Sequence, residues 1–390
     1  MKNRTRLLAA ALAVTLFAPM LHAENCIVKL GSVGPLTGAA SAWGLAHKAG
    51  PEFIAALTNE AGGLSIGGRK CRVEVVPYDS QYTAAGGAAA SNYLANEDVH
   101  AVIGPVGAPE HTGFKNVAKR YKQLSFTPTF AADALSPDFP LVFHENQGPA
   151  AWGMPVAREA VARFKFKSVM VIGPNDQTGT DIAKVSKPIY EKLGVKVFEE
   201  YYQRGTVNFL PIVQRILNQS PEAIEMAAVP PADMSVLVRQ FIEAGFQGVF
   251  GVLGGSGPAA VVLGAGGEKN LKALYWVEFV PLDDPGLVRM RADYQRLMKQ
   301  PAPENTLFYT SAIATEQVLH AMSIAGTSED GDRIATALRS SPPNSIYLGK
   351  GNWRGRSQFG INQELAFPAG MGMIVDGKRQ VVQRIDVVSE

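Results

Sequence analysis

The sequence predicts an α/β fold in which two doubly wound, Rossmann-like lobes are joined. First, strand-like apolar segments alternate with helical segments along almost the whole chain, which is the pattern of a doubly wound sheet. Second, several strand candidates are continuous apolar runs such as Val169–Ile172, as expected for parallel strands covered on both faces. Third, a chain of 390 residues is too long for one such sheet, since a domain usually holds about 100–200 residues.

Nine segments have the length and composition of strands. They are residues 27–33, 72–78, 101–104, 123–127, 168–173, 195–201, 223–228, 248–253 and 273–277. Between them, apolar residues in 209–217 and 234–242 are spaced alternately three and one apart. This spacing places them on one face of a helix, and we interpret both faces as core. Gly245 follows the second helix as a stop signal.

Segments rich in Pro, Gly, Asp or Asn predict connections between series of strands and helices. They cover residues 143–149, 278–285 and 342–352. The chain is therefore expected to pass between the two lobes more than once. We assign residues 24–144 and 281–345 to the first lobe and residues 145–280 and 346–390 to the second.

The N-terminus predicts export. Three basic residues within positions 1–6 precede an apolar run over 7–18, and small residues end at Ala23. This order is typical of a cleaved secretory signal peptide, residues 1–23. The run is too short to span a bilayer comfortably, although a membrane anchor stays an alternative. Cys26 follows a Glu-Asn pair rather than a small residue, which argues against a lipoprotein. We expect a soluble protein of the bacterial periplasm.

Composition limits the partners. Apolar residues make up 46% of the chain and charged residues only 18%, so nothing indicates disorder. Without residues 1–23, 34 basic residues face 35 acidic ones, and no basic tract occurs. Such a balance gives no electrostatic footprint for nucleic acid, and we expect no nucleic-acid partner.

Two cysteines, Cys26 and Cys71, each stand just before a strand candidate. If these strands are parallel neighbours, their starts lie side by side and the sulfurs can meet. In an oxidising compartment a pair of cysteines favours a disulfide. Two reduced thiols are the alternative.

Motifs for catalysis or cofactor binding are missing from the sequence. The six histidines show no metal-binding spacing. Gly254–Gly257 resembles a nucleophile elbow, but Pro258 stands where its second glycine belongs. We expect no catalytic residue, metal or cofactor, and hence not an enzyme. Two exported lobes without a catalytic signature favour a binding cleft at the carboxyl ends of the strands.

Several motifs, in this order and spacing, carry a resemblance to a known family. They are Gly-Ser-Val-Gly-Pro-Leu-Thr-Gly (31–38) with Trp43-Gly44, Asn-Glu-Ala-Gly-Gly (59–63), Val-Glu-Val-Val-Pro-Tyr-Asp (73–79), Val-Ile-Gly-Pro (102–105), Phe-Thr-Pro-Thr (126–129), the helix 209–217 and Leu-Val-Arg-Gln (237–240). Nearly the whole mature chain thereby resembles the leucine/isoleucine/valine-binding protein family, the periplasmic receptors of branched-chain amino-acid-type ABC importers. The resemblance implies a type I periplasmic binding protein with a three-segment hinge, a membrane permease as partner and closure around a small solute. We expect a monomer.

The resemblance also implies ligand-binding positions. Trp43 falls where the family places an aromatic ring against the ligand, although a core or surface Trp is the alternative. Positions associated with the ligand carboxylate are Gly107, Ala108, Thr129, Phe130 and Ala131. Positions on the second lobe are Thr178 and Gly254, and Met226, Ser256 and Phe279 are expected to line an enlarged pocket.

Departures from the family pattern set the ligand hypothesis. Ala108 lacks a serine hydroxyl, and Gly254 stands where amino-acid receptors place an acid against the ligand ammonium. A buried ammonium without a counter-charge costs several kcal/mol. We therefore expect a small organic or aromatic acid without an obligatory amino group. If the alignment slips, Asp176 or Asp233 could supply the acid, so a branched-chain amino acid stays an alternative. A sensory ligand-binding protein and a secreted enzyme are alternatives of other classes.

Overall fold

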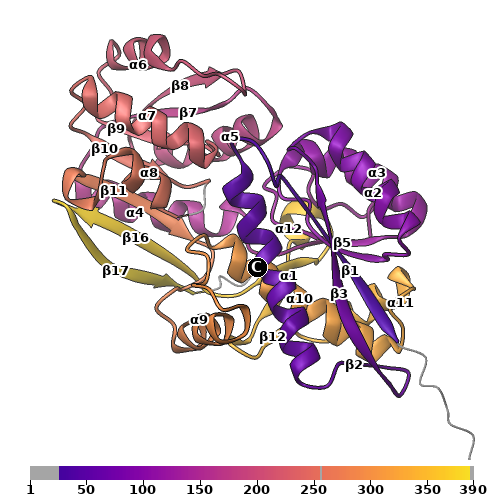
Figure 1. The fold of residues 1–390 in the computed structure, drawn as a ribbon. Coiled ribbons are helices and arrows are strands. Elements are labelled where there is room, and N and C mark those ends of the chain that lie inside the picture. Colours follow the sequence, from indigo (N-terminus) through magenta and orange to yellow (C-terminus); the bar gives the residue numbers. More distant parts are fainter. Residues whose placement is uncertain (1–25, 255–256, 387–390) are drawn as a thin grey trace, which may run out of the picture.

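Two lobes, each built on its own twisted sheet, make up the molecule (Figure 1). The computed structural model describes residues 26–254 and 257–386. The first sheet has eight strands in the order β14-β15-β6-β5-β4-β1-β3-β2, and the second has seven in the order β17-β16-β11-β10-β9-β7-β8. The central strands of both sheets run parallel. The expected doubly wound α/β class is confirmed.

The first lobe takes its elements from both halves of the chain. Its strands are β1 (Ile27–Gly34), β2 (Leu64–Ile66), β3 (Arg69–Asp79), β4 (Ala101–Ile103), β5 (Leu124–Thr127), β6 (Val142–His144), β14 (Asn352–Arg354) and β15 (Glu364–Ala366). Its helices are α1 (Ser41–Glu60), α2 (Ala84–Asn96), α3 (Ala108–Tyr121), α9 (Pro285–Met298), α10 (Leu307–Ala325) and α11 (Gly331–Ser340), with the short α12 (Arg356–Phe359) and the hairpin β12 (Asn344–Ser345) and β13 (Gly349–Lys350).

The second lobe is built from the middle of the chain and its end. Its strands are β7 (Ser168–Pro174), β8 (Lys196–Tyr202), β9 (Ala223–Met226), β10 (Val249–Val252), β11 (Ala273–Glu278), β16 (Ala369–Val375) and β17 (Lys378–Ile385). Its helices are α4 (Pro149–Phe164), α5 (Gln177–Lys192), α6 (Leu210–Leu217), α7 (Pro231–Glu243) and α8 (Ala259–Gly264), followed by a short 3-10 turn, Glu268–Asn270.

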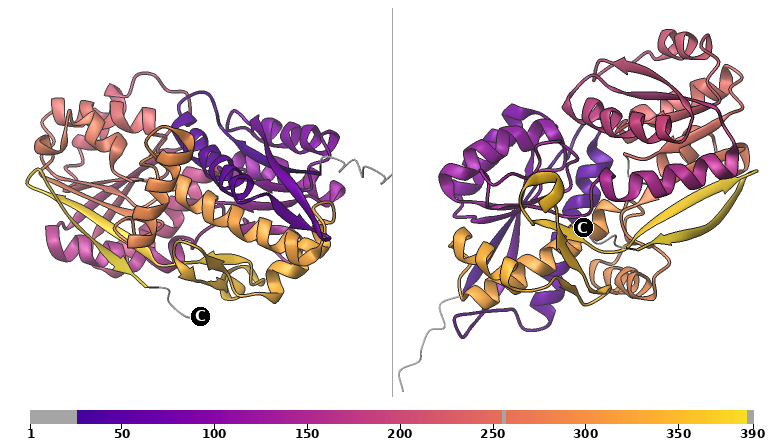
Figure 2. Two further views of the ribbon diagram at one scale, coloured as in Figure 1. Left: turned by 60° about the horizontal axis from the view of Figure 1, so that its bottom comes forward. Right: turned by 180° about the vertical axis from the view of Figure 1, so that it is seen from behind.

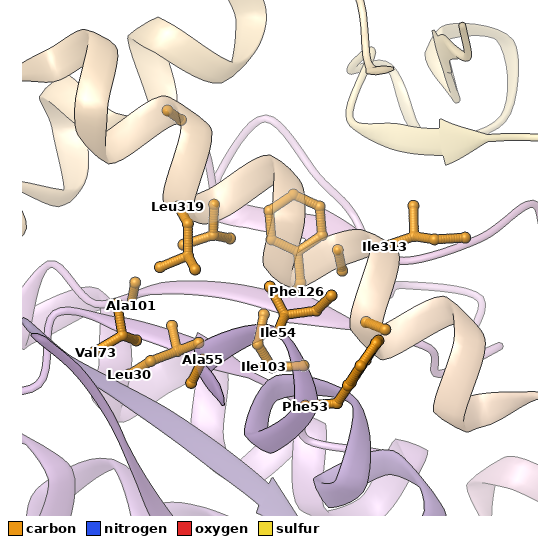
Figure 3. Close-up of a cluster of buried hydrophobic side chains, with 14 of the residues drawn as sticks. Leu30, Phe53, Ile54, Ala55, Val73, Ala101, Ile103, Phe126, Ile313 and Leu319 are labelled. Atoms are coloured by element: carbon orange, nitrogen blue, oxygen red, sulfur yellow. The ribbon is translucent and has the colours of Figure 1, made fainter. Parts of the chain in front are cut away.

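Helices cover both faces of each sheet, so the strands are buried on two sides. Figure 3 shows α1 and α10 packed over the first sheet, where Phe53 and Ile313 belong to the same buried cluster as the strand residue Phe126. A second cluster on the other face joins α2 and α3 through Leu94 and Phe114. Two-sided burial explains why the strands read as continuous apolar runs in the sequence.

All nine expected strands are present, within a few residues of their predicted bounds. The two segments with apolar residues on one helix face form α6 and α7. Gly245 follows α7 and has a left-handed φ of 91°. The strands β2 and β6 and the C-terminal strands were not predicted from the sequence. Most of these are short, such as the three-residue β6, or lie in turn-rich sequence. The seven-residue β16 is apolar but contains two glycines, which are depleted in strands.

The chain crosses between the lobes three times. The crossings follow β6, β11 and β15, and the last consists only of Phe367 and Pro368 between β15 and β16. The prediction placed this last boundary at 345/346, but β14 and β15 extend the first sheet. The Pro- and Gly-rich segment 342–352 is a hairpin within the first lobe, and a two-residue crossing leaves no signal in composition. Figure 2 shows β16 and β17 at one edge of the second lobe.

The predicted disulfide between Cys26 and Cys71 is present. Parallel pairing sets Ile27 of β1 opposite Arg72 of β3, which brings the preceding residues together as expected. The bond therefore ties the amino ends of two neighbouring strands. The predicted signal peptide, residues 1–23, lies outside the described residues, and none of the helices in the described ranges is long and apolar enough to cross a bilayer.

Candidate functional site

A cavity lies between the lobes, at the carboxyl ends of the parallel strands. The first lobe contributes Trp43, Tyr82, Val106, Pro128, Thr129, Phe130 and Leu307, and the remaining lining residues are Thr178, Ala228, Gly254 and Phe279. This is the edge at which ligands bind in open α/β sheets.

Short loops after the strands bring these side chains together. In the first lobe, Trp43 lies in the first turn of α1, and Thr129 and Phe130 follow β5. In the second lobe, Thr178 is the second residue of α5 after β7, and Gly254 follows β10. Asp176 fixes the start of α5 because its side chain accepts a hydrogen bond from Gly179 N–H (3.1 Å).

Six of the predicted site residues line this cavity: Trp43, Thr129, Phe130, Thr178, Gly254 and Phe279. Gly107 caps α3 directly beside it, and Ala108 N–H donates to Thr178 Oγ1 across the lobes (3.3 Å). Ala131 lies behind the lining, packed against Ala108 and Ala134.

Met226 does not line the cavity, contrary to the prediction. Its side chain is fully buried in the core of the second lobe, because it is the last residue of β9 and points toward the helices rather than the cleft. Ser256 lies outside the described residues.

Five lining residues were not predicted from the sequence: Tyr82, Val106, Pro128, Ala228 and Leu307. Tyr82 follows β3 at the same sheet edge as the other loops, so the strand-end rule could have found it. Leu307 begins α10, far along the chain, and no local signal places it here.

Four aromatic residues, Trp43, Tyr82, Phe130 and Phe279, are among those that line the cavity. Phe130 of the first lobe meets Phe279 edge to face, with ring centroids 5.4 Å apart, and also meets Trp152 at 5.8 Å. Trp43 and Tyr82 lie on the first lobe with centroids 6.0 Å apart. These rings offer flat apolar faces to a small solute.

The polar groups of the lining are hydroxyls. Thr129 and Thr178 contribute one each, and Tyr82 O–H donates to Thr178 Oγ1 (3.0 Å). Burial raises the pKa of Tyr82 far above its ordinary value, so its hydroxyl keeps its proton at any physiological pH. The α3 and α5 N-termini, which carry partial positive charge, meet where Ala108 N–H reaches Thr178.

None of the described lining residues carries a charge. Buried carboxyl groups lie behind the wall instead, and burial raises the pKa of Glu110 to about 8, of Glu225 to about 7 and of Glu278 to about 8. Glu110 accepts from Gly107 N–H (2.5 Å), and Glu225 accepts from Leu253 N–H (2.6 Å). These carboxyls support the loops rather than face the cavity.

The two aspartates considered as acids for an amino group are also engaged elsewhere. Asp176 accepts from Arg204 Nε (2.6 Å) in addition to capping α5. Asp233 accepts from Tyr202 O–H (2.9 Å). At Gly254 a Cβ atom would lie only 2.7 Å from Ile182 Cγ2, so a larger side chain does not fit without displacement.

Direct contacts join the lobes around the cavity. Gln177 at the start of α5 accepts from Thr112 Oγ1 (3.0 Å) and donates to Asp133 Oδ1 (3.1 Å). Asp181, one turn further, accepts from Ala132 N–H (3.0 Å). The first two turns of α5 therefore make several hydrogen bonds to the first lobe.

Buried polar groups hold the hinge. Glu145, just after β6, lies 2.7 Å from His47 Nε2 and accepts from Thr310 Oγ1 (3.3 Å). In the described part of the chain, no group of three or more His, Cys, Asp or Glu could hold a metal ion.

Two sheets, three crossings and an interlobe cavity define a class of solute receptor. The sequence profile of the periplasmic binding protein family matches residues 27–367. The chain belongs to this family and is of its branched-chain amino-acid type.

Individual relatives are distant but cover most of the chain. A Leu/Ile/Val-binding protein of Rhizobium johnstonii is 25% identical over 90% of this chain and 92% of its own. The substrate-binding protein of a Streptococcus pneumoniae branched-chain amino acid transporter, solved with isoleucine, superposes with a TM-score of 0.77 at 18% identity and covers 92% of this chain and 99% of its own. A solute binding protein of an R. palustris ABC transporter, solved with benzoate, gives 0.75 at 14% identity, over 93% and 98%.

Proposed function

We propose that the protein is the periplasmic receptor of an ABC importer and captures a small carboxylate-bearing solute, an organic or aromatic acid without an obligatory amino group. The observation that carries this proposal is the lining of the interlobe cavity, which combines aromatic rings and hydroxyls with no charged side chain among its described residues. The chain is taken to be exported by residues 1–23 and to act without catalysis.

The polar groups at the cavity suit a carboxylate better than an ammonium. Hydroxyls of Thr129 and Thr178 can donate to an anionic oxygen, and the α3 N-terminus at Ala108 adds positive potential. An ammonium would meet the same positive helix ends without a facing carboxylate. Leaving it unpaired would cost several kcal/mol.

Closure is proposed as the mechanism. The solute first contacts Trp43 and Thr129 on the first lobe. The second lobe then brings Thr178 and Gly254 against it, with bending at the three crossings. The solute favours the closed form only through contacts that the open form lacks. The closed receptor then delivers the solute to a membrane permease.

A branched-chain amino acid is the second candidate ligand, favoured by the R. johnstonii relative named for leucine, isoleucine and valine. The benzoate complex of the R. palustris neighbour indicates that this fold can hold an aromatic acid. A sensory role in which a membrane kinase reads the closed form is a third reading. A permease gene beside this one would favour transport, and a kinase gene would favour sensing.

A thermal-shift screen followed by calorimetry tests the proposal. The panel contains benzoate and substituted benzoates, short aliphatic acids, and L-leucine and L-valine. We expect stabilisation by one or more of the acids that lack an amino group. Stabilisation by leucine or valine alone would instead show that the ligand is a branched-chain amino acid.

A further inference from the structure

We infer that Tyr82 is a specificity-determining residue that orients Thr178, across the cleft, as a hydrogen-bond donor toward the ligand. The inference rests on the proposed function and deepens it, because it names the group that selects an acceptor oxygen. Tyr82 belongs to the first lobe, between β3 and α2, and Thr178 to the second. Both side chains line the cavity.

The hydrogen bonds that Thr178 already makes determine what its hydroxyl can still offer to a ligand. A threonine hydroxyl has one proton to donate and two lone pairs to accept with. Thr178 Oγ1 accepts from Tyr82 O–H (3.0 Å) and from Ala108 N–H (3.3 Å), which occupies both lone pairs. The proton of Thr178 is left for an acceptor, and the cavity that this side chain lines is the place for one. A carboxylate oxygen fits, whereas an ammonium would find no lone pair.

The ring of Tyr82 is clamped so that its hydroxyl cannot turn away. A Cβ atom on Gly107 would lie 2.3 Å from the ring, so the ring rests directly on the start of α3. On the second lobe, the Arg204 guanidinium lies 4.3 Å from the ring centroid, close enough for a cation–π contact. Tyr82 is only 6% exposed.

The backbone of Tyr82 is held in an unfavourable conformation to achieve this placement. Gln81 and Tyr82 both have left-handed φ angles, 53° and 58°, which cost roughly 1–2 kcal/mol for a residue with a bulky side chain. Asp79 holds the turn by accepting from Gln81 N–H (3.0 Å), and it also accepts from Leu36 N–H (2.8 Å). Such strain is typical of ligand clamps.

Arg204 and Thr178 connect Tyr82 to the same end of the second lobe. Asp176, which caps α5, also accepts from Arg204 Nε (2.6 Å). The Tyr82 hydroxyl therefore contacts the first turn of α5 directly, and its ring is linked to the α5 N-cap through Arg204. These contacts exist only when the lobes are together, so their loss should speed release of a ligand more than it slows capture.

The test compares Tyr82→Phe with wild type using benzoate and its neutral analogue benzyl alcohol. Loss of one hydrogen bond should weaken benzoate binding roughly fivefold to tenfold, mainly through faster dissociation. Benzyl alcohol can donate to the freed lone pair of Thr178, so its binding should stay equal or improve. If Tyr82→Phe leaves the preference for benzoate over benzyl alcohol unchanged, the inference is wrong.

Tyr201→Phe is the matched control, because the Tyr201 hydroxyl donates to Glu199 within the second lobe (2.9 Å). It should change neither affinity nor dissociation. A double-mutant cycle with Thr178→Val should show that the effects of the two changes are not additive. Additive effects would contradict the coupling between Tyr82 and Thr178.

A measurement without ligand separates this inference from the proposed function. Spin labels on Arg120→Cys and Lys192→Cys report the distance between α3 and α5, since the native cysteines are paired. Tyr82→Phe should shift the ligand-free distribution toward longer distances, and an unchanged distribution would count against the Tyr82–Thr178 link. If no acid in the panel binds wild type, the proposed function fails, while this distance still tests the link.

Discussion

Phe130 and Phe279 meet edge to face between the lobes, with ring centroids 5.4 Å apart. Phe130 follows β5 of the first sheet, and Phe279 follows β11 of the second, where the chain begins its second crossing. One wall of the cavity is therefore made at the hinge itself, while Trp43 and Thr178 are carried by helices on either side.

Replacing Trp43 by Ala should weaken ligand binding by about 2 kcal/mol or more, because a stacked indole contributes both area and ring contacts. Calorimetry with the best ligand of the panel measures the change. Leu45→Ala is the control, since Leu45 lies on the same helix and is 49% exposed. Equal affinities for wild type and Trp43→Ala would show that Trp43 does not contact the ligand.

Filling the space at Gly254 should disturb the second-lobe wall. In Gly254→Ala the new methyl group would lie 2.7 Å from Ile182 Cγ2, and overpacking of this kind typically costs about 1–3 kcal/mol. We expect lower affinity and a lower melting temperature. Adding Ile182→Ala removes the clashing methyl group and should recover part of the affinity, and no recovery would place the effect elsewhere.

Stability should fall as the pH rises, in part through Glu278. Burial raises the pKa of Glu278 from 4.5 to about 8, so the folded protein keeps a proton that the unfolded chain has released. The associated stability is fully present below about pH 4.5 and is lost as the pH approaches 8. Glu278→Gln should flatten the dependence of melting temperature on pH, whereas exposed Glu329→Gln should not. Identical pH profiles for Glu278→Gln and wild type would show that Glu278 does not titrate in this way.

Removing the disulfide should lower stability without changing the site. The bond closes a loop between residues 45 positions apart, and losing such a bond typically costs about 2–4 kcal/mol. Cys26→Ala/Cys71→Ala should therefore unfold at lower denaturant concentration. Ligand affinity should stay the same, because the bond lies at the amino ends of β1 and β3 and the cavity at the carboxyl ends. A large loss of affinity would show that the two ends are coupled.

The alternating strands and helices of the two sheets could be predicted from sequence, because buried parallel strands such as Val169–Ile172 produce continuous apolar runs. The disulfide followed from strand order. The last crossing, Phe367 and Pro368, could not be predicted, because two residues give no compositional signal. At the site, Trp43 and Thr178 could be proposed from the resemblance. The place of Tyr82 just after β3 also follows from the strand ends, but its contacts could not be predicted, since they depend on a left-handed turn and on the other lobe.

The short passage between β15 and β16 has a consequence for biosynthesis. When the ribosome has synthesised the chain up to residue 343, the strands β14, β15, β16 and β17 are still missing. Until they arrive, β6 and β11 are both open edges, which invite pairing with other chains. Neither lobe can thus be completed before residues 352–385 emerge, and neither could be exchanged as a single gene segment between receptors.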